Sequence, residues 1–98
     1  MASGSVKKYP AISYVDIFYT GLTILSNGTT TFNLSQTFDN NVIGVELKRA
    51  WPESNWNSGA IVSIVKWNFN QTTGTVSVTL STTSSQPYGV AIRVYYEE

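Results

Sequence analysis

An all-β fold, an antiparallel β-sandwich of six or seven strands, is what the 98-residue sequence predicts. Short runs alternate apolar and polar residues with a period of two, which is typical of half-buried strands. Clusters of Gly, Pro, Asn and Ser separate these runs, as turns and loops require. No segment has the 3.6-residue period of a helix. Residues 1–11 are expected to be a flexible lead-in, and residues 12–98 to form a single sandwich domain.

The first two expected strands cover residues 12–25 and 29–34. The inward face of the first begins with Val15, Ile17 and Tyr19. Ser26-Asn27-Gly28 lies between the two strands, and Asn-Gly supplies the positive φ angles of a tight hairpin turn. The sequence therefore predicts that these strands pair with each other.

Two longer apolar runs, residues 42–49 and 60–69, frame a connection over residues 50–59. In the first run one face is apolar, with Ile43, Val45 and Leu47.

The second run is apolar at both odd and even positions, and such a strand needs cover on both faces. One face carries Val62 and Ile64. The other carries Ile61, Val65, Trp67 and Phe69, which are the candidate oligomer interface. A small domain without disulfides is also marginally stable alone, which favours a homo-oligomer.

The last two expected strands cover residues 75–82 and 89–96, with polar loops before each. Both alternate regularly, and the loop before the last strand ends at Tyr88. Arg49, Tyr88 and Arg93 are compatible with either a binding site or an interface, and the sequence does not decide between these roles.

The composition argues against catalysis and against several classes of ligand. The chain contains no His and no Cys, so the Ser-His-Asp and Cys-His arrangements are excluded, and no metal site or cofactor is expected. Six basic and six acidic residues cancel, which gives no attraction to nucleic acid or to anionic membranes. The apolar runs are too short for membrane insertion, and the N-terminus lacks the apolar core of a signal peptide.

The connection between the two long runs is the candidate ligand-binding segment. Its side chains combine aromatic faces with hydrogen-bonding groups that suit sugar rings and their hydroxyls. The candidate residues are Trp51, Glu53, Asn55, Trp56 and Asn57. In the alternative interpretation the two indoles cap the sandwich or lie at a subunit contact.

Several segments together resemble the small β-sandwich domains of bacteriophage tail fibres, and the related H-type lectin fold. They are Thr20–Leu34, Phe38–Leu47, Thr73–Leu80 and Val90–Tyr96. The resemblance implies a homotrimer in the virion that contacts other virion proteins and recognises a host-surface glycan or protein. Two alternatives stay open. One is a purely structural virion protein, such as a capsid decoration or fibre trimerisation module, and the other is a bacterial carbohydrate-binding module.

Overall fold

The computed structural model describes residues 11–26, 28–53 and 59–98, which contain six strands and no helix. In chain order the strands are β1 (Ile12–Ile24), β2 (Thr30–Thr37), β3 (Val42–Pro52), β4 (Val62–Asn70), β5 (Thr75–Thr82) and β6 (Gln86–Glu97).

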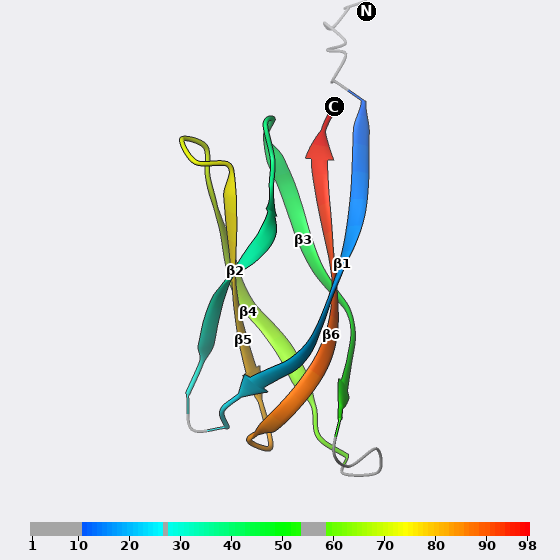
Figure 1. The fold of residues 1–98 in the computed structure, drawn as a ribbon, viewed down its shortest axis with the longest axis vertical. Coiled ribbons are helices and arrows are strands. Elements are labelled where there is room, and N and C mark those ends of the chain that lie inside the picture. Colours follow the sequence, from blue (N-terminus) through cyan, green and yellow to red (C-terminus); the bar gives the residue numbers. More distant parts are fainter. Residues whose placement is uncertain (1–10, 27, 54–58) are drawn as a thin grey trace, which may run out of the picture.

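The strands form two three-stranded antiparallel sheets that pack face to face (Figure 1). One sheet has the order β1-β6-β3, and the other has the order β2-β5-β4. The predicted all-β sandwich is therefore confirmed, with six strands. Only β4 and β5 are consecutive strands that pair with each other, so every other connection crosses from one sheet to the other.

The prediction of a hairpin between the first two strands is wrong. β1 pairs with β6 and β2 pairs with β5, so the chain around Ser26 crosses between the sheets. Ser26 is held by Ser85 of the β5–β6 turn, whose Oγ accepts a hydrogen bond from the Ser26 amide at 2.6 Å. Gly28 does not have a positive φ, which a two-residue hairpin turn of the Asn-Gly kind needs. Long-range pairing has overridden the local turn preference.

The core is dominated by the two central strands, β5 and β6. Their inward side chains are completely buried between the sheets. They are Val76, Val78 and Leu80 of β5, and Tyr88, Val90, Ile92 and Val94 of β6. Both strands have a sheet neighbour on each side, and the regular alternation seen in the sequence follows from that position.

Tyr88 is the one polar side chain among these fully buried groups. The sequence placed it in a loop, but β6 begins at Gln86, so Tyr88 points inward from the strand. Its hydroxyl donates to the Ser84 carbonyl oxygen at 2.6 Å and lies 2.6 Å from Thr82 Oγ1. Because both partners are provided, burial leaves the phenol oxygen satisfied.

The edge strands differ from the central strands in their register. Along β1, β2, β3 and β4 the pairing slips by one or two residues, and each added residue lies on the edge strand. In β1 the slip lies between Tyr19 and Leu22, where Gly21 has a φ of 68°. These are β-bulges, which bend a strand and change which residues face the core.

A bulge at Val65 resolves the doubly apolar strand. Before it, Val62 and Ile64 pack against the core, and after it Trp67 and Phe69 do. The interpretation that this strand has two buried faces is therefore wrong, because one extra residue shifts the inward positions from even to odd numbers. Of the candidate interface residues, Trp67 and Phe69 pack within the sandwich, while Ile61 and Val65 are exposed.

β3 contains two such slips. Val42 pairs with Tyr96 and Gly44 with Tyr95, which leaves Ile43 unpaired and exposed. The prediction that Ile43 lines the inner face is thus wrong, and Val42 is buried in its place. β3 also continues beyond the predicted end through Pro52, which an edge strand tolerates because no neighbour needs its missing N–H.

Candidate recognition surface on the β1-β6-β3 sheet

The outer face of the β1-β6-β3 sheet carries aromatic and charged side chains. Because the even-numbered residues of β6 face the core, its odd-numbered residues point outward. Strand pairing places matching residues of β1 and β3 on either side of them. From the end at the C-terminus downward, the rows are Tyr14–Tyr95–Gly44, Asp16–Arg93–Glu46, Phe18–Ala91–Arg49 and, without a β1 partner, Gly89–Trp51.

An ion pair crosses the middle of this face. The Arg93 guanidinium donates from Nε to Asp16 Oδ1 at 2.7 Å and from Nη2 to Asp16 Oδ2 at 3.0 Å. This two-point contact holds the pKa of Asp16 below its ordinary value. The same guanidinium lies 4.0 Å from the ring centroid of Tyr14. Asp16 and Arg93 thus neutralise each other, and the pair is fixed against an aromatic ring.

Trp51 lies across the backbone of β6. Gly89 is its direct partner, and a side chain at residue 89 would overlap the indole, since a Cβ there would lie 2.2 Å from its ring carbons. Gly89 therefore provides the space in which the indole can lie close to the sheet. Arg49, two residues earlier on the same face of β3, places its guanidinium 4.9 Å from the Trp51 ring centroid.

Arg49 is the unneutralised charge of this face. Arg93 pairs with Asp16, and Lys48 lies 3.6 Å from Glu46. Within residues 11–26, 28–53 and 59–98, Arg49 contacts no carboxylate. Its planar fork of N–H donors is instead held on an indole. Such a guanidinium is suited to bind a carboxylate or phosphate through two hydrogen bonds.

The predicted binding residues have different positions. Trp51 is half-buried on strand β3 and so is not a loop residue. The Glu53 carboxylate accepts a hydrogen bond from the Gly21 amide, and its own amide donates to the Pro87 carbonyl at 3.2 Å. Glu53 therefore braces the β1 bulge against the start of β6. Asn55, Trp56 and Asn57 lie outside the described residues.

Sequence reasoning left Arg49 and Arg93 without a role and gave none to Gly89 or Tyr14. The sequence does contain one usable signal, because Arg49 and Trp51 are two residues apart and share a strand face. Gly89 is distant along the chain, and only the pairing of β3 with β6 brings it under the indole.

The opposite face of the sandwich has another chemistry. The outward residues of β2, β5 and β4 are almost all hydroxyls and amides, and two shallow hollows of about 340 and 430 Å³ lie over them. The first is lined by Asn33, Asn68, Asn70, Thr73, Thr75 and Ser77. The charge on this face is Lys66, and a hydrogen bond of 2.8 Å joins the hydroxyls of Thr31 and Thr79.

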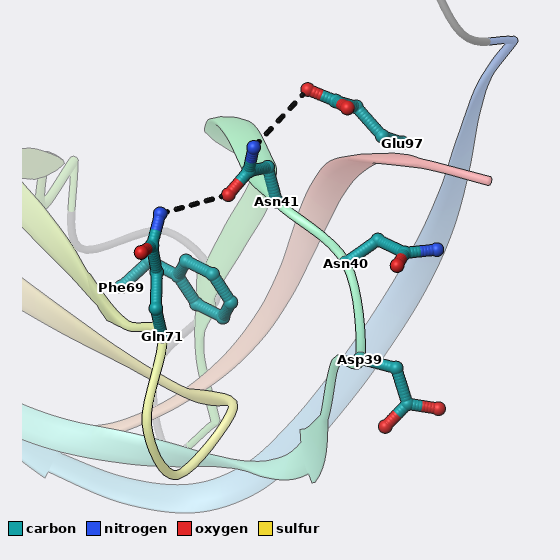
Figure 2. A pocket seen from close by; sticks show the side chains of 6 residues that line it. All are labelled: Asp39, Asn40, Asn41, Phe69, Gln71 and Glu97. Carbon is teal, nitrogen blue, oxygen red and sulfur yellow. Dashed lines mark hydrogen bonds between the residues drawn. The ribbon is translucent and has the colours of Figure 1, made fainter.

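A third hollow, of about 280 Å³, lies at the end of the sandwich near the C-terminus (Figure 2). Asn41 lies at its centre, where its amide accepts from Gln71 Nε2 at 2.9 Å and donates to Glu97 Oε1 at 3.5 Å. Figure 2 shows Asp39 pointing away from these three side chains. The polar groups here bind one another, so the cluster joins the β2–β3 loop, the β4–β5 turn and β6.

Among the described residues, no group of three or more acidic, His or Cys side chains is placed to hold a metal ion. No helix in that part of the chain is long and apolar enough to cross a membrane. No family model, curated protein or solved structure matches this chain.

Proposed function

We propose that this protein is a non-catalytic recognition module, a tail-fibre-type virion protein that binds a glycan on the host surface. The observation that carries the proposal is the Arg49 guanidinium, which stacks on Trp51 and has no carboxylate partner in the described chain. The resemblance of the strand order and turns to phage tail-fibre domains supplies the biological setting.

The side chains of this face support binding more than chemistry. Tyr, Trp and Arg are the residues enriched where proteins make their strongest contacts, because each combines a large surface with few lost rotamers. Tyr14, Tyr95 and Trp51 follow the sheet, and Arg93 and Arg49 lie on two of the aromatic rings. The face is rigid because it belongs to paired strands, so little conformational entropy is lost on binding.

The proposed ligand is a saccharide that carries a carboxylate or a phosphate. The guanidinium of Arg49 would bind the anion at two points, and the aromatic rings nearby would contact the sugar. A neutral saccharide would leave this guanidinium without a counter-charge, so the anionic class is favoured.

The test is binding of the full chain to an array of saccharides with and without anionic groups. Wild-type protein is expected to bind anionic members, and Arg49→Ala to lose about tenfold or more in affinity, as for a charged two-point contact. Arg49→Lys should recover only part of the loss, because an ammonium lacks the planar fork.

The matched control is Lys66→Ala, which removes a cation from the opposite face and should leave binding unchanged. Circular dichroism of each variant establishes that the fold is retained. Absence of binding by the wild-type protein, or equal binding by Arg49→Ala, would contradict the proposal. Absence of binding would favour the purely structural virion role.

A further inference from the structure

The edge of β1 is the longest regular edge in the described sandwich. Residues Ile12–Tyr19 pair one for one with Val90–Glu97, so eight consecutive residues have no bulge. On β2, β3 and β4 the uninterrupted paired stretches contain at most five residues. No strand lies beyond β1 in its sheet (Figure 1). Its outer backbone groups are available to another strand.

The same stretch exposes large apolar side chains on its outer face. Ile12 is 55%, Tyr14 56% and Phe18 67% exposed, and all three lie on the outer face of β1. The other edge strands are protected from pairing by their bulges, which twist and interrupt an edge. A long, regular and apolar edge is the feature that promotes pairing with another strand.

We infer that β1 pairs with β1 of a second copy, antiparallel about a twofold axis at Val15, so that two β1-β6-β3 sheets become one six-stranded sheet. The inference is independent of the proposed function. A twofold contact uses the same surface on both copies, so one self-complementary strand is enough to build it.

The side chains select this register. Opposite residues of an antiparallel pair share a face, so a twofold axis must pass through a single residue. An axis at Asp16 would place two like charges opposite each other, which is destabilising. An axis at Val15 places Ile12 opposite Phe18 of the second copy, and Tyr14 opposite its Asp16. Two apolar pairs then flank the centre of the contact.

Charge complementarity favours the same occupant. Arg93 lies on the ring of Tyr14 in its own copy. In the Val15 register, the Asp16 of the second copy lies directly opposite that Tyr14. Each guanidinium therefore has a carboxylate in its own chain and another across the contact, and the shared surface has no net charge.

The first measurement is the mass of the full chain in solution over a range of concentrations, by sedimentation. Twice the chain mass of 10.8 kDa is expected. Ile12→Lys/Phe18→Lys should be monomeric, because each introduced ammonium faces another across the contact. Ile12→Lys/Phe18→Glu changes the same residues but places opposite charges together, so it should remain a dimer.

The matched control is Ile61→Lys/Val65→Lys. These residues belong to the apolar run of β4, and at 63% and 53% they are as exposed as the β1 pair. This variant should keep the dimer.

A cross-link tests the register, since the chain contains no cysteine. Val15→Cys should form a disulfide-linked dimer on oxidation, because opposite Cα atoms in an antiparallel pair lie within disulfide range. Ser13→Cys should not, because its copy would lie about 13 Å away along the strand.

A monomeric wild-type protein, a trimer, or a dimer unaffected by Ile12→Lys/Phe18→Lys would overturn the inference. So would dissociation by Ile61→Lys/Val65→Lys, which would place the contact on β4. A Ser13→Cys cross-link without a Val15→Cys cross-link would exclude the Val15 register.

Discussion

The central strands and the edge strands of this sandwich tolerate irregularity differently. No register slip adds a residue to β5 or β6, whereas each of the four edge strands contains at least one added residue. A central strand has hydrogen-bonded neighbours on both sides, so an added residue would disturb two ladders. An edge strand has water on one side, where the extra backbone groups can be solvated.

The comparison shows that the sequence pattern is reliable where pairing is double. Val76, Val78 and Leu80 alternate without error on β5 and are completely buried. On β4 the inward positions change number at Val65, because the bulge absorbs one residue. Regular alternation therefore marks the centre of each sheet, and interrupted alternation marks its edges.

The largest expected difference comes from deleting one residue in each kind of strand. Deletion of Ser77 from β5 should prevent folding, because it turns half of the strand's buried residues toward water. Deletion of Val65 from β4 should preserve the fold and change the free energy of unfolding by roughly 1 kcal/mol or less, because it removes an exposed bulge residue. Circular dichroism and urea unfolding measure both, and folded protein without Ser77 would contradict the comparison.

A smaller contrast is expected between two isoleucines. Ile92 on β6 is completely buried, while Ile43 on β3 is 45% exposed. Ile92→Ala should lower the free energy of unfolding by about 2–5 kcal/mol, since it removes core contacts and leaves a cavity. Ile43→Ala should stay within about 0.5 kcal/mol of wild type. Equal midpoints in urea for the two variants would show that burial is not what separates centre from edge.

The third contrast concerns one hydroxyl. Tyr88→Phe removes a buried phenol oxygen that binds Ser84 and Thr82, and should cost about 1–2 kcal/mol. Tyr14→Phe removes an exposed phenol oxygen from edge strand β1 and should cost close to nothing. Thermal unfolding of the two variants provides the measurement. A Tyr88→Phe protein as stable as wild type would mean that water replaces the lost partner.

The smallest effect expected is a pH dependence from the pair that links edge to centre. Arg93 on β6 lowers the pKa of Asp16 on β1 in the folded state. The stability that this pair provides is therefore present above the ordinary pKa of 3.8 and is lost as the pH falls through the lower, folded-state value. Asp16→Asn should remove that part of the acid dependence, so its unfolding midpoint should change less than that of wild type below about pH 4. Parallel curves for the two proteins would contradict this assignment.

The sequence predicts the fold class and the central strands, and its failures are specific. The hairpin at Asn27-Gly28 was a local signal, but β1 and β2 each have a stronger long-range partner. The bulges at Ile43 and Val65 have no glycine or proline to mark them, so a period of two cannot locate them. Local sequence specifies strands well and specifies their register poorly.

The candidate surface was half predictable. Trp51 was identified as a recognition residue from its chemistry, although the structure moves it from a loop to a strand. Its position depends on Gly89, and its cationic neighbour is Arg49. The first relation arises from pairing between distant segments, which composition and spacing do not encode.

Ala11 and Glu98 are joined by a backbone hydrogen bond of 2.9 Å, so the two ends of the described sandwich meet at one pole. β6 runs from Tyr88, opposite Pro52, to the end near Val42, so Trp51 lies toward the other pole (Figure 1). A fusion made at either terminus would therefore attach at the same pole. Such a carrier would leave the Arg49–Trp51 end pointing outward, and a short linker between residues 98 and 11 would give a circular permutant with new ends in a chosen loop.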